Sequence, residues 1–348
     1  IVICGYYGYG NVGDEAMLAS LTTVLAENKN IGRIYVMSAT QIKSAEKYNV
    51  DAVARFDFSA VSTALSKSDV MIFGGGNILQ DKTRTKSLLY YLQMIRLARA
   101  HACRVALCAN GIGPIIRKKN MERVREALTL ADYISIRDEA SLALARELTG
   151  RDNIYNTSDL VCALQKSETQ KGTSTIEGKY YIICPKKIKG FSAFTLISLC
   201  TELREKYDLV PVFLPMHERE DTALCRELAA RIDGAIVANA EDCAALFGGA
   251  EFSVCMRLHS VIFSLMEKCP MIGISDDGKM SAFLSTVGVS ECAFFPADAE
   301  SADICVAVRK IIENRADIRD SLGFEAARHR EKAQKELERL AIFLEKKS

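Results

Sequence analysis

The stretch Met256–Ser260 (MRLHS) brings together residue types that could carry out chemistry. It follows the apolar run Phe252–Cys255, expected to be a strand, and leads into Ser260–Glu267, expected to be a helix. Alternation at the strand end predicts Arg257 and His259 on one side, and the start of a helix offers free backbone N–H groups to an anion. A cation, a proton carrier and an anion cradle would then meet, which makes His259 the chief catalytic candidate. The alternative is a helix-capping or hydrogen-bonded core histidine.

Cationic side chains also follow other expected strands: Arg137, Lys186, Lys187 and Lys279. Lys279 comes after the strand Met271–Ile274 and is expected to point into the same crevice as His259. Arg137 is either a ligand for an anion or the ion-pair partner of Asp138 or Glu139. The two neighbouring lysines belong to a basic loop that is either solvated or phosphate-binding.

A glycine-rich turn near the N-terminus separates an expected strand, Ile1–Tyr7, from an expected helix, Asp14–Asn28. Residues 8–13 satisfy the pattern G-x-G-x-x-G, which leaves bare backbone N–H groups at a helix N-terminus, where anions or ligand oxygens bind. A dinucleotide site would also need an acidic residue after the second strand, but Arg33–Met37 runs into Ser-Ala-Thr-Gln. Acidic residues in the first helical turn would also repel a pyrophosphate. A sugar or small anion is therefore favoured over NAD.

Two further glycine-rich loops follow expected strands, Gly74–Asn77 after Asp69–Phe73 and Asn110–Pro114 after Arg104–Ala109. Glycine permits close backbone approach to a ligand, and Asn77 is suited to start the next helix. The alternative for each loop is a tight turn. Because the carboxyl ends of parallel strands share one edge, these loops are expected to share one crevice.

Short β-branched runs alternate with amphipathic stretches along the chain, the rhythm of parallel sheets covered by helices on both faces. The expected fold class is α/β, with two Rossmann-like parallel-sheet domains in a glycosyltransferase-B-like (GT-B-like) layout and a C-terminal helix. Residues 165–179 are polar and aperiodic, as in a linker. The expected divisions are an N-terminal domain, a linker, a C-terminal domain and a helix: 1–164, 165–179, 180–315 and 316–348.

Composition excludes several function classes. With 45 Lys and Arg against 44 Asp and Glu, the net charge of +1 offers no general field for nucleic acid, so no DNA or RNA partner is expected. The 12 cysteines form no C-x-x-C pair and are expected to be free thiols in a reducing cytoplasm, with no metal site. No apolar run reaches the ~18 residues of a membrane span. Zinc-hydrolase, Walker and Ser-His-Asp patterns are absent from the sequence, which disfavours those enzyme classes.

Five stretches taken together resemble the polysaccharide pyruvyl transferase family, most closely its cell-wall ketalase branch, CsaB. They run in order over nearly the whole chain: Gly5–Met17, Gly74–Asp81, Asn110–Pro114, Ser135–Glu139 and Met256–Ser260. The resemblance implies transfer of the enolpyruvyl unit of phosphoenolpyruvate to two hydroxyls of a sugar, giving a pyruvate ketal and phosphate. In that branch the sugar is a lipid-linked N-acetylmannosamine of a wall-polymer precursor, and the ketal anchors surface-layer proteins. A cytoplasmic enzyme without metal or cofactor, with phosphoenolpyruvate as co-substrate, is implied.

The resemblance also suggests roles for the donor-side residues. Phosphoenolpyruvate carries a phosphate and a carboxylate, which need fixed cations, and Arg137, Arg257 and Lys279 are expected to supply them. His259 is expected to protonate the methylene carbon and deprotonate the sugar hydroxyl, while the helix N-terminus at Ser260 assists phosphate departure.

Where the family is expected to have an arginine after the strand Tyr180–Cys184, this chain has Lys186 and Lys187, one of which is expected to replace it as phosphate ligand. A lipid-linked acceptor implies peripheral contact with the membrane face, for which the loops Arg117–Lys119 and Lys186–Lys189 are candidates. The acceptor sugar is assigned to first-domain residues: Gly10, Asn11, Asp14, Gly74, Gly75, Gly76 and Asn77.

Two other functions fit the same patterns. A glycosyltransferase that uses a nucleotide sugar would share the two-domain fold, and it would respond to UDP where a pyruvyl transferase would not. The chain could also be a binding protein without catalytic activity. Replacing Arg257 or His259 would then change only the affinity for the ligand, because such a protein has no turnover.

Overall fold

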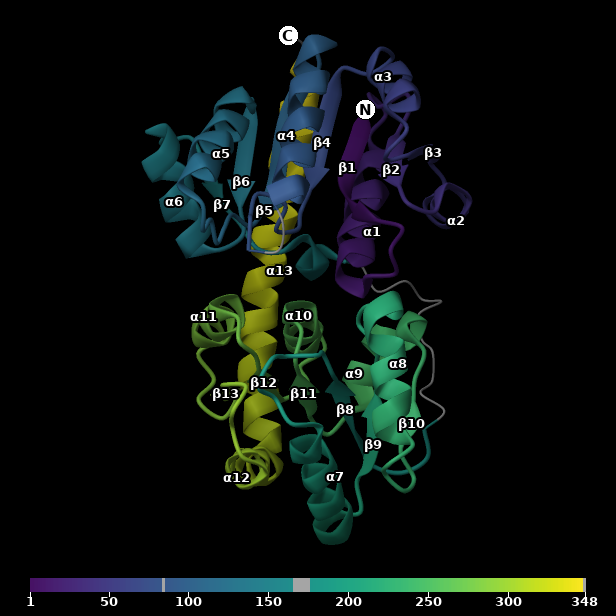
Figure 1. The fold of residues 1–348 in the computed structure, drawn as a ribbon, viewed down its shortest axis with the longest axis vertical. Helices are drawn as coiled ribbons and strands as arrows, with labels where there is room; N and C mark the ends of the chain where they lie inside the picture. The colour runs from purple at the N-terminus through teal and green to yellow at the C-terminus, as the bar shows by residue number, and fades with distance from the viewer. Residues whose placement is uncertain (83–84, 165–175, 347–348) are drawn as a thin grey trace. The chain divides into compact units, whose positions relative to one another are not determined.

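The computed structural model describes residues 1–82, 85–164 and 176–346. The chain divides into two compact units (Figure 1): Ile1–Leu164 with His329–Ser348 form the N-terminal unit, and Gln165–Arg328 form the C-terminal unit. The expected linker, 165–179, lies mostly outside the described residues. Within the described part, no helix combines the length and the apolar character that crossing a membrane requires.

The N-terminal unit is built on a parallel sheet with the strand order β3-β2-β1-β4-β5-β6-β7. The order reverses between β1 and β4, which creates a switch point where the loops after these two strands diverge and where open α/β sheets bind ligands. The strands of this unit are β1 (Val2–Tyr7), β2 (Tyr35–Ser38), β3 (Asp51–Ala54), β4 (Val70–Gly74), β5 (Arg104–Asn110), β6 (Tyr133–Ile136) and β7 (Tyr155–Asn156).

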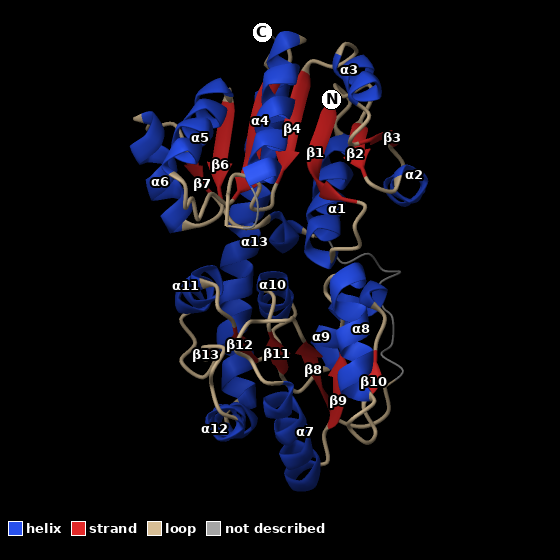
Figure 2. Cartoon of the chain, viewed as in Figure 1, coloured by secondary structure: helices blue, strands red, loops and turns tan. Residues whose placement is uncertain are grey.

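Helices cover both faces of this sheet (Figure 2), because strands such as β4 and β5 are almost continuously apolar and are buried on both sides. On one face, Phe73 and Leu107 share a core cluster with residues of α3 to α6. On the other face lie α1, with buried Met17 and Leu21, and the last turns of the C-terminal helix. The helices are α1 (Val12–Glu27), α2 (Gln41–Tyr48), α3 (Phe58–Leu65), α4 (Thr85–Ala100), α5 (Lys118–Leu130) and α6 (Glu139–Thr149), with a 3₁₀ turn at Leu160–Ala163.

The C-terminal unit repeats this plan with the parallel order β10-β9-β8-β11-β12-β13, so its switch point lies between β8 and β11. The strands are β8 (Tyr180–Cys184), β9 (Val210–Phe213), β10 (Ile236–Val237), β11 (Ser253–Cys255), β12 (Met271–Ile274) and β13 (Phe294–Phe295). The helices are α7 (Ala193–Tyr207), α8 (Glu218–Ala229), α9 (Cys243–Gly249), α10 (Leu258–Met266), α11 (Gly278–Val287) and α12 (Ser301–Glu313), with a 3₁₀ turn at Ala240–Asp242.

The last helix, α13 (Arg315–Glu345), contributes to both units, with the division at His329. Its final turns pack on the N-terminal sheet through Glu336, which is fully buried. One Glu336 carboxylate oxygen accepts hydrogen bonds from the Tyr133 hydroxyl (2.8 Å), from Cys108 Sγ (3.4 Å) and from the Ser135 hydroxyl. His329, at the division between the two units, is buried, with Nδ1 3.0 Å from the Ser158 hydroxyl.

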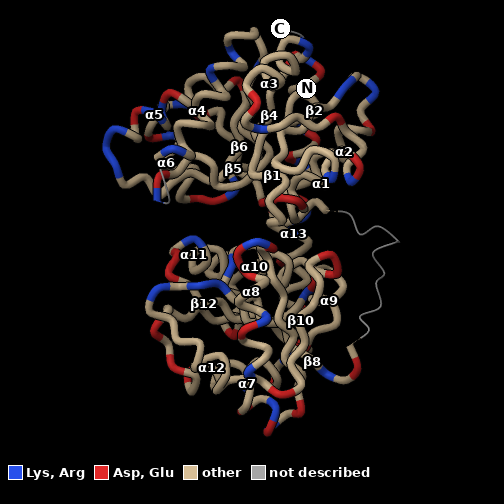
Figure 3. Tube along the Cα trace, turned by 45° about the vertical axis from the view of Figure 1, so that its right-hand side comes forward, with Lys and Arg blue, Asp and Glu red and all other residues tan. Residues whose placement is uncertain are grey.

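Charge is spread over both units without a face of one sign (Figure 3), in keeping with the net charge of +1. All twelve cysteines are buried free thiols, as their apolar surroundings in the sequence predict. Among the described residues, no group of three or more His, Cys, Asp or Glu is placed to hold a metal ion.

Candidate active site

The switch point of the C-terminal unit carries most of the expected donor-side residues. Cys255 at the end of β11 is in register with Cys184 of β8 and with Gly273 of β12, so the loops after these strands leave the same edge of the sheet. Those loops place four of the predicted residues at this edge: Lys186, Arg257, His259 and Lys279.

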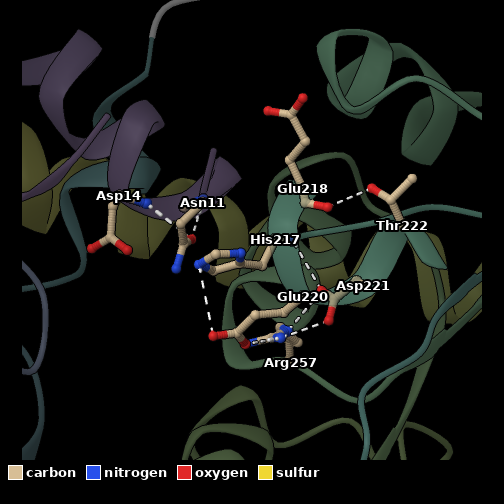
Figure 4. Close-up of polar contacts among 9 residues, drawn as sticks. Asn11, Asp14, His217, Glu218, Glu220, Asp221, Thr222 and Arg257 are labelled. Atoms are coloured by element: carbon tan, nitrogen blue, oxygen red, sulfur yellow. Dashed lines mark hydrogen bonds and ion pairs between the residues drawn. The ribbon is translucent and has the colours of Figure 1, made fainter. Parts of the chain in front are cut away.

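Arg257 lies at the N-cap position of α10 in extended conformation and is clamped by two acidic side chains of α8 (Figure 4). Its Nε and Nη2 donate to the two carboxylate oxygens of Asp221, at 2.8 and 2.6 Å, and Nη2 also donates to Glu220 at 2.7 Å. The Asp221 side chain is 2% exposed, whereas that of Glu220 is 59% exposed. Burial disfavours the charge of Arg257, but the two carboxylates outweigh it and hold its pKa above the ordinary value.

His217 and Lys186 complete this cluster. The backbone N–H of His217 donates to Asp221 at 2.9 Å, and its Nε2 lies 4.0 Å from a Glu220 oxygen. Burial lowers the pKa of His217, which favours the neutral ring. The pKa of Glu220 is lowered, first by its hydrogen bond with Arg257, and the charge of Lys186 contributes in the same direction.

The acidic partners of Arg257 are absent from the sequence-based prediction of the site. They lie 36 and 37 positions before Arg257, on the helix after β9, and only the strand order brings the two helix N-termini to one edge. The available signal was that Glu220 and Asp221 follow a strand end in the first turn of α8, as Arg257 follows a strand end before α10.

His259 and Ser260 occupy the first turn of α10, which begins at Leu258 and not at Ser260 as expected. The strand alternation predicted for Arg257 and His259 therefore does not apply, because the chain is already helical at His259. The Ser260 hydroxyl donates to the Arg257 carbonyl at 2.5 Å and is fully buried, so it serves the local turn. Lys279 is the second residue of α11, and its backbone N–H donates to the N-cap Asp277 at 3.1 Å.

The glycine-rich turn after β1 uses its N–H groups internally. The side-chain oxygen of Asn11 accepts from the N–H groups of Gly13 (3.1 Å) and Asp14 (3.4 Å), which caps α1. Glu15 accepts from the N–H of Gly8 at 2.8 Å. These three N–H groups are therefore not bare, contrary to expectation. Gly10 remains in the turn in the left-handed region (φ 72°).

The glycines after β4 are required by the close approach of α1. A Cβ atom on Gly75, which has φ 75°, would lie 2.4 Å from Met17 Sδ, and one on Gly74 would lie 2.6 Å from the Tyr7 hydroxyl. A Cβ on Gly76 would meet the Asp14 carboxylate at 3.4 Å. The first two glycines thus have a packing role, which corresponds to the tight-turn alternative.

Asn77 does not start the next helix, which begins at Thr85. Its amide donates to the Gly113 carbonyl at 2.8 Å and so ties the loop after β4 to the loop after β5. Asn110 reinforces this link by donating to the Gly75 carbonyl at 2.6 Å. These two bonds join the two glycine-rich loops.

Arg137 lies at the end of β6 in the N-terminal unit. It is ion-paired with Asp159, and both side chains are buried, at 8% and 2% exposure. The alternative partners considered from sequence, Asp138 and Glu139, are used elsewhere. Asp138 caps α6 by accepting from the Ser141 N–H at 2.8 Å, as predicted, and Glu139 accepts from the Asn156 amide.

Comparison with known proteins links this arrangement to a family and to a fold. The sequence model of the family "Polysaccharide pyruvyl transferase" matches residues 11–278. No curated protein sequence matches the chain.

Solved structures share the fold at low sequence identity. UDP-GlcNAc 2-epimerase from Methanocaldococcus jannaschii has a TM-score of 0.64 at 14% identity, covering 89% of this chain and 92% of that one. UDP-GlcNAc 2-epimerase from Neisseria meningitidis, bound to UDP-GlcNAc, has a TM-score of 0.63 at 12% identity, with 96% and 97% covered. A glycosyltransferase from Rickettsia africae has a TM-score of 0.59 at 10% identity, with 100% and 98% covered. These likenesses confirm the expected GT-B-like class of two parallel-sheet domains.

Proposed function

The chain belongs to the polysaccharide pyruvyl transferase family, and from that premise we propose that it transfers the enolpyruvyl unit of phosphoenolpyruvate to two hydroxyls of a saccharide. The products are a cyclic pyruvate ketal and phosphate. The observation that carries the proposal is the cluster at the β8–β11 switch point, where cations and a histidine lie at one sheet edge: Lys186, Arg257, His259 and Lys279.

The chemistry requires a proton carrier and fixed positive charge. One sugar hydroxyl forms a bond to C2 of phosphoenolpyruvate while C3 gains a proton and becomes a methyl group. The second hydroxyl then replaces the phosphate at C2. The two hydroxyl protons are thereby accounted for, one on C3 and one on the released phosphate. An imidazole can both accept and donate a proton, which suits both proton movements, and His259 fills that role in our proposal.

The cations orient phosphoenolpyruvate and stabilise the leaving phosphate. Lys186 or its exposed neighbour Lys187 replaces the arginine expected in the family, and Lys279 lies in the first turn of α11, after the neighbouring strand β12. Arg257 already donates to Asp221 and Glu220 through Nε and Nη2, so an oxygen of phosphoenolpyruvate must compete with these carboxylates for its positive charge. The exposed Glu220 is the partner that can leave, whereas the buried Asp221 keeps the guanidinium in place.

For the acceptor we propose a lipid-linked wall-polymer precursor carrying N-acetylmannosamine, as in the CsaB branch. Its ketal would anchor surface-layer proteins. The loops that would receive it contain Gly10–Asp14 and Gly74–Asn77, with phosphoenolpyruvate as the co-substrate and no further cofactor. Such an acceptor calls for a cytoplasmic enzyme that visits the membrane face through the basic loops Arg117–Lys119 and Lys186–Lys189.

Thermal unfolding with phosphoenolpyruvate, UDP, UDP-GlcNAc and NAD in parallel tests the donor. A ligand at about 100 times its Kd adds roughly 2.7 kcal/mol, which raises Tm by a few degrees. We expect a rise with phosphoenolpyruvate that is lost in Arg257→Ala. A rise with UDP compounds alone would instead favour a nucleotide-sugar glycosyltransferase; UDP-GlcNAc is the nucleotide sugar named for two of the structural neighbours, both of them epimerases.

A further inference from the structure

A buried arginine of the N-terminal unit, Arg55, is surrounded by aromatic rings and has no acidic partner. It follows β3 directly, at the carboxyl edge of the sheet, and is 5% exposed. The centre of its guanidinium lies between 4.9 and 5.8 Å from the centroids of four rings: Tyr6, Tyr9, Phe56 and Tyr90. We call these five residues the Arg55 cluster.

The polar contacts of this guanidinium leave its charge uncompensated. Nη1 donates to the Gly5 carbonyl at 3.1 Å, a side-chain hydrogen bond joins the guanidinium to Tyr91, and Nε has no hydrogen-bond partner. No salt bridge joins Arg55 to an acidic side chain anywhere in the described chain. The arginines of the two sites described above are each paired, the buried Arg137 side chain with Asp159 and the half-buried Arg257 with Asp221.

A buried guanidinium without an anion is costly, and attraction to aromatic faces recovers only part of that cost. The Arg55 cluster therefore retains an excess of positive charge together with an unused N–H donor. Both features are complemented by an oxyanion, and Arg is the side chain best suited to phosphate because its donors form a planar fork.

The rings around Arg55 provide a surface for a sugar. Tyr6 and Tyr9 stack on each other, with centroids 4.3 Å apart and planes 13° apart, and both are partly exposed. Phe56 is 63% exposed. Tyr9 belongs to the glycine-rich turn that also contains Gly10 and Asn11, so the cluster continues directly into the loop assigned to the acceptor. Aromatic surfaces with one charged group are typical of small-molecule sites.

We propose that the Arg55 cluster binds the phosphate-bearing end of a saccharide. The Arg55 guanidinium contacts a phosphate or diphosphate oxygen, and the rings of Tyr9 and Phe56 pack on the adjoining sugar. The assignment rests on the proposed function only in taking that saccharide to be the acceptor. A lipid-linked saccharide and a nucleotide sugar share this phosphate–sugar junction, so both are tested.

Isothermal titration calorimetry with N-acetylglucosamine 1-phosphate tests the site. We expect Arg55→Met to weaken binding at least tenfold, and phosphate-free N-acetylglucosamine to bind weakly and be insensitive to this change. Arg33→Met is the matched control: Arg33 also lies over a tyrosine, Tyr35, at 5.8 Å, but it is exposed and paired with Asp51. It should bind like the wild type. Equal binding by the wild type and a folded Arg55→Met protein would overturn the proposal.

If Arg55→Met fails to fold, Arg55→Lys and Phe56→Ala replace it, because the first keeps the charge and the second removes a largely exposed ring. We expect Phe56→Ala to weaken binding severalfold; wild-type affinity in both variants would refute the site. A short-chain alkyl diphosphate saccharide and UDP-N-acetylglucosamine then serve as further probes. If the variants lose affinity for one of these two probes, the result supports the site and shows which kind of saccharide phosphate binds there.

Competition with phosphoenolpyruvate separates this inference from the proposed function. Saturating phosphoenolpyruvate should not displace N-acetylglucosamine 1-phosphate, and displacement would place the sugar phosphate in the donor site, against the proposal. If phosphoenolpyruvate does not bind at all while N-acetylglucosamine 1-phosphate still binds in an Arg55-dependent way, the proposed pyruvyl transferase function is rejected. The proposed saccharide-binding site at Arg55 is then still supported.

Discussion

At the scale of single residues, the state of Arg257 decides how the donor site works. Asp221 holds the guanidinium with two hydrogen bonds and is buried, which makes this pair a fixed part of the fold. Glu220 holds it with one bond from an exposed position. A trianionic donor must compete with Glu220 for Arg257, since like charges at one cation repel. Glu220 therefore works against donor binding, and Asp221 works in favour of it by positioning the cation.

Replacing these two acids should have opposite effects on the donor. We expect Glu220→Gln to tighten phosphoenolpyruvate binding by up to about tenfold, which corresponds to ~1.4 kcal/mol. Asp221→Asn should weaken it by a similar factor, because Arg257 loses its bidentate partner. Calorimetric titration measures both. Glu218→Gln is the control, since Glu218 is an exposed acid in the same turn of α8. If Glu218→Gln tightened phosphoenolpyruvate binding as much as Glu220→Gln, the effect would come from the loss of one negative charge near the site and not from the release of Arg257.

His259 should be needed for turnover and not for binding. Glutamine keeps the size and polarity of the side chain but cannot carry a proton, so His259→Gln is expected to lower kcat by roughly 10²–10⁴-fold. Phosphoenolpyruvate affinity and Tm should change little, because His259 is only partly buried in the first turn of α10 and glutamine is of similar size and polarity. Phosphate release measures the rate. Near-normal turnover by a folded His259→Gln protein would remove His259 from the catalytic role.

At the scale of elements, several helix N-termini are capped by side chains of this chain, which a glycine-rich pattern alone does not predict. Asn11 caps α1, Asp138 caps α6 and Asp277 caps α11, each with a side-chain oxygen on backbone N–H groups. A pattern such as G-x-G-x-x-G predicts the turn and the helix that follows it, although α1 begins at Val12 and not at Asp14. It does not reveal that a neighbouring Asn or Glu has already taken the N–H groups that a ligand would use.

Two substitutions at Asn11 separate its cap from a role in acceptor binding. Asn11→Ala should lower the free energy of unfolding by about 0.5–2 kcal/mol, because the N–H groups of Gly13 and Asp14 lose their acceptor. Asn11→Ser should largely keep that stability while removing the amide. Denaturant unfolding and the acceptor KM are measured for both variants. A raised acceptor KM in a stable Asn11→Ser protein would show that Asn11 takes part in acceptor binding. An unchanged KM would show that Asn11 serves only as the N-cap of α1.

The attachment of α13 to the N-terminal sheet should depend on pH through Glu336. Burial raises its pKa above the ordinary value of 4.5, although hydrogen bonds from Ser135, Tyr133 and Cys108 oppose the shift. The folded state then binds the proton more tightly than the unfolded state, so Glu336 lowers stability as pH rises from 4.5 through the folded pKa. In Glu336→Gln that fall should disappear, because the amide is neutral and its oxygen can still accept the same bonds.

Urea unfolding between pH 5 and pH 8 measures this effect. We expect Glu336→Gln to gain on the wild type as pH rises. Glu336→Leu should be destabilised at every pH by about 1–3 kcal/mol for each donor left without an acceptor. Parallel pH profiles for the wild type and Glu336→Gln would contradict an elevated pKa.

At the scale of the whole molecule, the fold followed from local pattern, while the partners inside each site did not. The strands Tyr180–Cys184 and Met271–Ile274 were predicted at their observed bounds, because β-branched runs between turn residues are a local signal. β13 has only two residues, Phe294–Phe295, and gives no such signal. Pairs such as Arg137 with Asp159 join separate loops, and only the strand order determines which loops meet.

Hydrogen exchange should assign each substrate to one unit. Phosphoenolpyruvate is expected to slow exchange at the loops after β8, β11 and β12, that is at residues 185–187, 256–260 and 275–279. A sugar phosphate should slow it at residues 5–13 and 54–57 around the Arg55 cluster. The loop after β6 decides the role of Arg137, because the ion pair with Asp159 already occupies that cation. Protection of residues 135–139 by phosphoenolpyruvate would return Arg137 to the donor site, whereas unchanged exchange there would leave it a structural ion pair of the N-terminal unit.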